Sequence, residues 1–249
     1  MTPATDTTEA EVRRLLHDVT TRERGWRAEQ EFAANAAHEL RNPIAAISGS
    51  LEVLQGGAKD VPDDRDRFLG HIERETARLG RLVAALLLLA RIQTGQERPS
   101  LRLVELCPLL EDVAGQLEPQ PGVTIAVNCP TRVAVLADEQ LIRQAILNVA
   151  ANAANHTSAG EITIDGRDVG AFAEIEVRDT GGGIGPDEAP HVFGRFYRSR
   201  GRIPGTGFGL GLPIARAIAR ELGGNITLTS ELGAGTCVRI HVPSAKVVA

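Results

Sequence analysis

The stretch FAANAAHELRNPI, from Phe32 to Ile44, lies inside a region whose apolar residues have the spacing of a helix. From about Glu9 to Gln55 the sequence is helix-like, and Pro43 is the only proline in that span. Apolar residues recur at alternating steps of four and three, which is typical of a seam between packed helices. The seam positions are Ala33, Ala37, Leu40, Ile44, Ile47, Leu51 and Leu54.

A second helix with a similar seam is predicted after a short turn. Glycine and aspartate are frequent from Gly56 to Asp64, where Asp63 or Asp64 is a candidate N-cap. Two helices joined by a short turn form an antiparallel hairpin whose apolar stripe is uncovered, so we expect a second copy to complete a four-helix bundle. Packing of the stripe on the chain's own C-terminal half is the alternative. The second seam is Leu69, Ile72, Thr76, Leu79, Val83, Leu86 and Ala90.

Beyond Pro99 the pattern changes, and short apolar strands alternate with helices. Strands are predicted at 123–127, 133–136, 161–165, 173–178, 225–230 and 236–242, and helices at 107–116, 138–154 and 212–222. Strands mixed with helices over roughly 145 residues indicate an α/β sandwich. We therefore expect an N-terminal helix (1–30), a helical hairpin (31–97) and an α/β domain (98–249).

Composition and charge exclude several classes of protein. Of the 249 residues, 43% are hydrophobic and 24% are charged, as in a globular protein. The formal net charge of -5 argues against a nucleic-acid partner. No apolar run approaches the ~20 residues of a membrane span, and no secretory signal is visible, so we expect a cytoplasmic location unless an upstream segment provides a membrane anchor. The three cysteines are far apart, and we expect them to be reduced and buried.

The first predicted helix carries a candidate nucleophile. Because Ala37 and Leu40 lie on the seam, His38 falls beside it and faces water, and Asn42 shares that face. Glu39 can hydrogen-bond one ring nitrogen and raise the basicity of the other. An exposed neutral imidazole is a competent nucleophile, although His38 could also be an ordinary surface residue. A zinc-protease motif is excluded because asparagine replaces its second histidine.

A pair of asparagines lies on the predicted helix 138–154. Asn148 and Asn152 are four residues apart, so their amides project from one face of the helix. Amide oxygens suit Mg²⁺, a hard cation that also binds phosphates. Two solvent-facing asparagines are the alternative, but the remainder of this helix is apolar, which favours a face that lines a site.

Glycine-rich stretches follow the asparagines. Asp179 ends the predicted strand 173–178, and a buried carboxylate there can accept a hydrogen bond from an adenine amino group. Glycines at 181, 183 and 185, and at 205–211, permit the close backbone approach that phosphate binding requires. The stretch 195–206 is polar and basic and contains glycine and proline, which predicts a mobile lid. Purely structural turns are the alternative for each glycine run.

Taken in order, five motifs resemble those of sensor histidine kinases. His38–Pro43 resembles the H-box, and residues 147–157 resemble the N-box. Residues 179–185 and 205–212 resemble the two glycine boxes, with 192–198 between them resembling the F-box. The resemblance covers most of residues 30–243. It implies a dimeric four-helix bundle followed by a Bergerat-type α/β sandwich domain that binds ATP.

The same resemblance implies a reaction and its residues. His38 would be phosphorylated from ATP with Mg²⁺, assisted by Glu39, and the phosphoryl group would pass to an aspartate in the receiver domain of a response regulator. Asn42 matches a residue that positions water when such kinases dephosphorylate that partner. Asn152 would be the main metal ligand, supported by Asn148. The implied nucleotide-binding residues are Asn148, Asn152, Asn155, His156, Asp179, Gly181, Gly183, Arg198, Gly207, Gly209, Leu210, Gly211 and Thr236.

One position departs from the family pattern. Asn155 stands where lysine or arginine is usual, which removes a charge that would neutralise phosphate. A dimeric scaffold that binds nucleotide but transfers little is therefore the alternative function. A third possibility is a kinase that acts on serine, as in the related anti-sigma proteins. The helical hairpin and the H-box disfavour it.

Overall fold

The structure, a computed structural model, describes residues 4–94, 99–198 and 207–245; side chains are described from residue 26, apart from 27 and 28. The chain divides into two compact units, Met1–Leu82 and Val83–Ala249. The predicted division into an N-terminal helix (1–30), a hairpin (31–97) and an α/β domain (98–249) stays a prediction. Across the described ranges, we find no helix long and apolar enough to cross a membrane.

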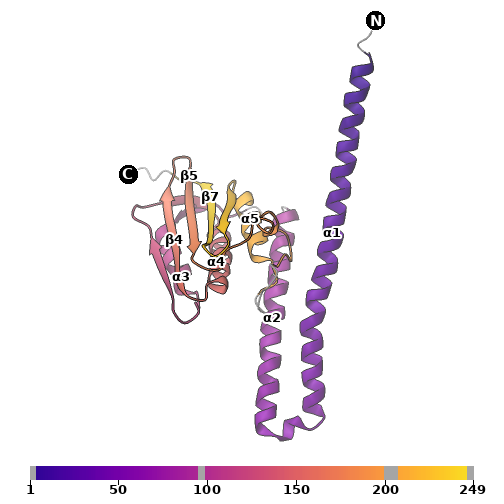
Figure 1. Ribbon diagram of the computed structural model, residues 1–249, viewed down its shortest axis with the longest axis vertical. Helices are drawn as coiled ribbons and strands as arrows, with labels where there is room; N and C mark the ends of the chain where they lie inside the picture. The colour runs from indigo at the N-terminus through magenta and orange to yellow at the C-terminus, as the bar shows by residue number, and fades with distance from the viewer. Residues whose placement is uncertain (1–3, 95–98, 199–206, 246–249) are drawn as a thin grey trace. The chain divides into compact units, whose positions relative to one another are not determined.

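Two long helices, α1 (Ala4–Gln55) and α2 (Pro62–Thr94), run antiparallel as predicted (Figure 1). The short helix η1 (Ala58–Asp60) lies in the turn between them. Because Pro62 is the first residue of α2, Asp63 and Asp64 lie in its first turn, and the prediction that one of them is the N-cap is wrong. Proline fits this position because the first N–H groups of a helix have no intrahelical partner.

The predicted seams divide into two rows of residues in the structure. One row is buried or half-buried, and it comprises Leu40, Ile47, Leu54, Ile72 and Leu79. Inside the hairpin, the Ser50 hydroxyl lies 2.9 Å from Nδ1 of His71. The other row is exposed, with Ile44 at 50%, Leu51 at 44% and Leu69 at 46%. Ile44 and Leu51 are seven residues apart on α1, and Leu69 and the exposed Val83 are two such steps apart on α2, so one apolar side of the hairpin is left uncovered.

The second unit is built on a five-stranded sheet (Figure 1). The strand order is β2-β4-β5-β7-β6, with β2 and β4 parallel and the other pairs antiparallel. These strands are β2 (Val123–Asn128), β4 (Gly160–Asp168), β5 (Phe172–Asp179), β6 (Asn225–Glu231) and β7 (Gly235–Pro243). A separate two-stranded sheet pairs β1 (Arg102–Glu105), which was not predicted, with β3 (Ala134–Ala137).

Helices α3 (Leu106–Gly115), α4 (Glu139–His156) and α5 (Gly211–Glu221) pack on one face of the five-stranded sheet. A one-turn helix, η2 (Ala189–His191), lies between β5 and α5. Helix α4 begins after Asp138 because that side chain accepts hydrogen bonds from the N–H groups of Gln140 and Leu141. The core between helices and sheet includes the fully buried Ile142, Ile146, Ile162, Ile164, Ile175 and Ile240.

The opposite face of the sheet carries a network of charged side chains. Glu176 on β5 is only 5% exposed. Its carboxylate accepts hydrogen bonds from Arg178 at 2.8 Å and from Arg239 on β7 at 2.6 Å. Burial raises the pKa of Glu176, but these two guanidinium groups outweigh it and hold the pKa below its usual value. The neighbouring Glu174 is paired with Arg167 and His241.

Replacing Glu176 with glutamine is expected to destabilise the folded state by about 3 kcal/mol at pH 7, because two guanidinium groups lose a buried anion. The native pKa lies below the unfolded value, so the carboxylate stabilises the fold above the unfolded pKa and the benefit is lost as pH falls through the native pKa. Urea denaturation at pH 7 and in acid measures both effects. An equal difference between variant and wild type at both pH values would contradict this account.

Two of the three cysteines are paired. Cys107 and Cys129 form a disulfide with a Cα–Cα distance of 5.5 Å, so the prediction that all three are reduced is wrong for this pair. They are 22 residues apart in sequence and come together because α3 packs beside the end of β2. Cys237 is free and buried, as predicted. Burial raises the pKa of its thiol.

Candidate active site

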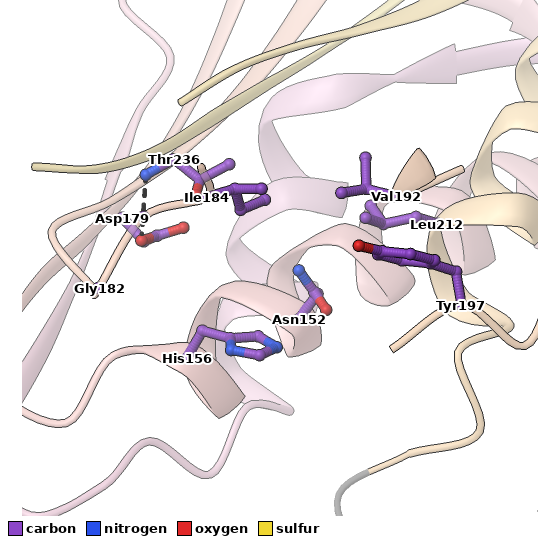
Figure 2. Close-up of a pocket in the computed structure, with 10 residues that line it drawn as sticks. Asn152, His156, Asp179, Gly182, Ile184, Val192, Tyr197, Leu212 and Thr236 are labelled. Carbon is purple, nitrogen blue, oxygen red and sulfur yellow. Dashed lines mark hydrogen bonds between the residues drawn. The ribbon is translucent and has the colours of Figure 1, made fainter. Parts of the chain in front are cut away.

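A cavity in the second unit lies between α4, the end of β5 and the start of α5 (Figure 2). Five of the residues predicted to bind nucleotide line it, namely Asn152, His156, Asp179, Gly183 and Thr236. They come from helix α4, strands β5 and β7, and the loop after β5, which are distant in sequence. Gly182, Ile184, Val192, Tyr197 and Leu212 also line it and were not predicted.

The carboxylate of Asp179 is fixed by backbone groups. Its Oδ1 accepts hydrogen bonds from the N–H of Gly181 at 2.9 Å and from the N–H of Thr236 at 3.3 Å. Figure 2 shows the second oxygen turned away from Thr236 toward the cavity. Asp179 is only 6% exposed, and burial raises its pKa although the two N–H groups oppose that shift. The site therefore offers an oriented acceptor in an environment that disfavours charge.

Apolar side chains form a wall beside this carboxylate. Val192 and Leu212 are buried, and Ile184 and Tyr197 are half-buried (Figure 2). A flat aromatic ring would fit against such a wall while the carboxylate binds its polar edge. The signals for these residues were their places in the motifs, because Ile184 lies inside the first glycine box and Leu212 is the last residue of the second.

Ser230 on β6 joins the glycine loop to the sheet. Its hydroxyl donates to the carbonyl oxygen of Gly235 at 2.8 Å and accepts from the N–H of Ile184 at 2.8 Å. Since that proton is used, the hydroxyl of Thr236, 2.9 Å away, is the donor to Ser230. Gly183 adopts φ +67°, and a Cβ there would overlap the carbonyl oxygen of Glu231. Only glycine fits at this point of the loop.

The two asparagines differ in their surroundings. Asn152 points its amide toward the cavity, with His156 one turn further along α4 (Figure 2). Asn148 lies one turn earlier, and its amide oxygen accepts a hydrogen bond from Gln144 at 2.9 Å. Its amide nitrogen is buried and has no hydrogen-bond partner among the described residues. Asn148 thus has a free donor, whereas Asn152 keeps its carbonyl oxygen available for a cation.

Helix α5 starts with the second glycine box. Leu210 is its N-cap, and no described side chain caps the first N–H groups of the helix. Uncapped N–H groups at a helix start favour anions. Gly207 and Gly209 have φ of +68° and +69°, and a Cβ at Gly209 would overlap the carbonyl oxygen of Tyr197. The backbone before α5 therefore adopts a conformation that requires glycine at these two positions.

Several predicted residues lie away from the described cavity lining. Asn155 is exposed on the last turn of α4, and Arg198 is half-buried. Gly181 acts through its N–H on Asp179 rather than by lining the cavity. Most of the predicted lid, residues 199–206, lies outside the described part of the chain. Gly207, Gly209, Leu210 and Gly211 form the approach to α5.

On α1, His38 is exposed as predicted. Its Nδ1 lies 3.5 Å from the amide nitrogen of Asn42, which is on the same face of the helix. The described contact involves Nδ1 and not Nε2. The carboxylate of Glu39 contacts Arg78 of α2 at 3.9 Å. The predicted hydrogen bond between Glu39 and the imidazole stays a prediction, and the ring contact described here is made by Asn42.

Comparison with known proteins agrees with this geometry. Residues 28–95 match the family described as His Kinase A (phospho-acceptor) domain. Residues 137–246 match the family described as histidine kinase-, DNA gyrase B- and HSP90-like ATPase. The two matches contain the exposed imidazole and the cavity respectively. Together they span most of the chain in the order found in sensor histidine kinases.

Relatives and solved structures support the same assignment. The sensor-like histidine kinase SenX3 of Mycolicibacterium smegmatis is 34% identical over 86% of this chain, which spans 57% of that relative. The structure of full-length ShkA in complex with AMPPNP has a TM-score of 0.67 and 28% identity, covering 88% of this chain and 47% of ShkA. The histidine kinase AdeS of Acinetobacter baumannii has a TM-score of 0.68 and 25% identity, covering 83% of this chain and 97% of the AdeS chain.

The chain belongs to the sensor histidine kinases, and it contains their phospho-acceptor and ATPase domains. The predicted fold, a helical hairpin followed by an α/β sandwich, is thereby confirmed. The chain spans little more than half the length of the SenX3 relative.

Proposed function

We propose that this chain phosphorylates His38 from ATP and passes the phosphoryl group to an aspartate of a response regulator. The observation that carries the proposal is an exposed, oriented imidazole in a chain that also has a cavity with a fixed carboxylate acceptor. The domain family supports ATP as the nucleotide. The partner is inferred from membership of the sensor histidine kinases, whose cytoplasmic parts act on receiver domains.

The base of ATP would bind at Asp179. Its cavity-facing oxygen would accept a hydrogen bond from the adenine amino group, while Ile184 and Leu212 contact the ring faces. Guanine presents a carbonyl oxygen at the corresponding position, which a carboxylate repels, so adenine is selected. Thr236 lies beside Asp179, so we assign it to the base end of the site.

The phosphates would bind at the start of α5. The uncapped N–H groups there, and the loop that includes Gly207 and Gly209, are suited to an anion. Asn152 would hold Mg²⁺ through its amide oxygen, and the ion would neutralise phosphate charge. The donor at Asn148 suits a phosphate oxygen better than a metal. His156 on the same helix is a further candidate for phosphate contact.

In the reaction, Nε2 of His38 attacks the γ-phosphorus in line. A nitrogen–phosphorus bond forms as the bond to the bridging oxygen of ADP breaks. Nε2 can attack only when the ring hydrogen is on Nδ1, so the Asn42 amide would turn its oxygen toward Nδ1 to accept that hydrogen and restrict ring rotation. Once its contact with Arg78 is broken, the Glu39 carboxylate would accept the proton from Nδ1 as the nitrogen–phosphorus bond forms. Asn42 would also position water for dephosphorylation of the partner.

The test is incubation with radiolabelled ATP and Mg²⁺, followed by peptide mapping. Label that is lost in acid, stable in base and confined to the peptide containing His38 is the expected result. Nucleotide binding without such label would point instead to a scaffold, the reading favoured by the uncharged Asn155. Label on serine would contradict both proposals.

The exposed apolar row on the hairpin supports a homodimer. A second copy would cover Ile44 and Leu51 and complete a four-helix bundle. Replacing both with aspartate is expected to weaken self-association at least about 100-fold, because carboxylates would be desolvated in the interface. Sedimentation velocity measures the change. Ala45→Asp, an exposed substitution beside the row, is the control, and a dimer that persists in the double variant would contradict this arrangement.

A further inference from the structure

We propose that Cys107 and Cys129 form a reversible redox-modification site that controls the stability of the second unit. The site takes low-molecular-weight thiols and disulfides as reactants. It is independent of the nucleotide cavity, and its test does not require kinase activity. Three observations support it. The two cysteines are bonded, both are partly exposed to solvent, and a glycine on the neighbouring strand leaves room for the sulfur atoms.

The bond joins the start of α3 to the end of β2. Cys107 is the second residue of α3, and Cys129 directly follows β2. Strand β2 is an edge strand that pairs only with β4 in the described sheet. Helix α3 has no side-chain cap at its start. The disulfide therefore fastens an uncapped helix end to a sheet edge, where local opening would otherwise be easiest.

Both cysteines can react with small molecules. Each is half-buried, so solvent reaches the pair. Cys107 lies in the first turn of α3, where the positive end of the helix dipole favours a thiolate. The third cysteine differs, because Cys237 is buried within the sheet and burial raises the pKa of its thiol. Reaction is thus expected at the pair and not at Cys237.

The neighbouring strand leaves room for the bond. Gly166 on β4 is buried, and a Cβ there would lie 2.8 Å from Cδ1 of Leu110 and 3.2 Å from Sγ of Cys129. These distances are shorter than ordinary van der Waals contacts. The Gly166 backbone has a negative φ that other residues also adopt, so packing, rather than backbone conformation, explains the absence of a side chain here.

The chemistry balances without any group from the protein beyond the two cysteines. The Cys107 thiolate attacks one sulfur of oxidised glutathione and releases one glutathione thiolate. The Cys129 thiolate then attacks Sγ of Cys107 in the mixed disulfide and releases the second glutathione thiolate. Two protons leave the protein in total, and one molecule of oxidised glutathione is reduced. A small dithiol reverses both steps.

The bond is tested first by mass spectrometry of the full chain. After treatment with oxidised glutathione and alkylation, trypsin leaves both cysteines in one peptide, Leu103–Arg132. We expect this peptide to lack both alkyl groups and to be lighter than its reduced form by two hydrogens. Cys237 should be alkylated after unfolding. Full alkylation of Cys107 and Cys129 in the oxidised sample would overturn the proposal.

The consequence is tested by calorimetry with and without dithiothreitol. Closing a loop of this length is expected to raise the melting temperature by about 10 °C, so reduction should lower it by that amount. The melting temperature of Cys237→Ser should fall on reduction as that of the wild type does. The double variant Cys107→Ser/Cys129→Ser should have the melting temperature of the reduced wild type, and dithiothreitol should not change it. An equal response of the double variant to reductant, or an unchanged melting temperature in the reduced wild type, would overturn the stability role.

Discussion

His38→Ala is expected to abolish label from radiolabelled ATP, to below about one thousandth of the wild-type rate, because alanine has no nucleophile to form the nitrogen–phosphorus bond. Nucleotide affinity should be unchanged, since the cavity is built entirely from residues of the second unit. Filter binding of labelled protein and titration with a fluorescent ATP analogue measure the two quantities. Losing both together would indicate a folding defect rather than loss of the acceptor.

The matched control for His38 is Asn35→Ala, an exposed alanine substitution one turn earlier on α1. Its labelling rate should stay close to that of the wild type because alanine favours the helix more than asparagine does and the acceptor imidazole is untouched. Persistent acid-labile label in His38→Ala would refute the assignment of the acceptor. Mixing His38→Ala with a variant defective in nucleotide binding adds information, because restored label would show transfer between subunits of the dimer.

Asp179→Asn is expected to weaken ATP binding at least about 100-fold, which corresponds to ~2.7 kcal/mol. The asparagine oxygen can still accept the N–H groups of Gly181 and Thr236. Its amino group then replaces the cavity-facing oxygen and meets the adenine amino group donor to donor. Two opposed donors lose a hydrogen bond and leave both groups unsatisfied. Calorimetric titration measures the affinity, and wild-type affinity in the variant would contradict the base contact.

The same variant should be more stable than the wild type at pH 7. Burial raises the pKa of Asp179 above its unfolded value, so the protonated form favours folding at low pH. That stabilisation is present below the unfolded pKa and is lost as pH rises through the native pKa. The neutral asparagine avoids the loss. The melting temperature of the variant should therefore exceed that of wild type at pH 7, with the gap closing toward pH 4.

The control for Asp179→Asn is Asp187→Asn, which makes the same chemical change at an exposed position. Both its nucleotide affinity and its melting temperature should match the wild type. A higher melting temperature in both variants would mean that net charge, rather than burial of one carboxylate, governs the effect.

Much of the fold could be predicted from sequence because it depends on periodic burial. The alternating steps of four and three identified both long helices, and the alternation before Asp179 identified β5. Strand β1 was missed because it has four residues and buries only Val104, which leaves no pattern to detect. The pairing of Cys107 with Cys129 was also missed, since it depends on how α3 packs beside β2.

The site was predicted where chemistry is local in sequence. Asp179, Asn152 and His156 could be assigned because their motifs are contiguous, and the structure brings them to one cavity. The apolar wall was not assigned, although Val192 and Tyr197 lie in the F-box, because the fold decides which hydrophobic residues of that motif face the cavity. The contact of Glu39 with Arg78 was not predicted, because it crosses from one helix to the other.

The links through Ser230 have a consequence for product inhibition. The N–H of Ile184 and the hydroxyl of Thr236 both bond to Ser230, so the base end of the cavity is braced before any nucleotide arrives. ADP carries the same base as ATP and would gain every contact that this end offers. Discrimination between ADP and ATP must then come from the phosphate end of the site, at the loop that includes Gly207 and Gly209. A falling ATP:ADP ratio in the cell would restrain such an enzyme through simple competition.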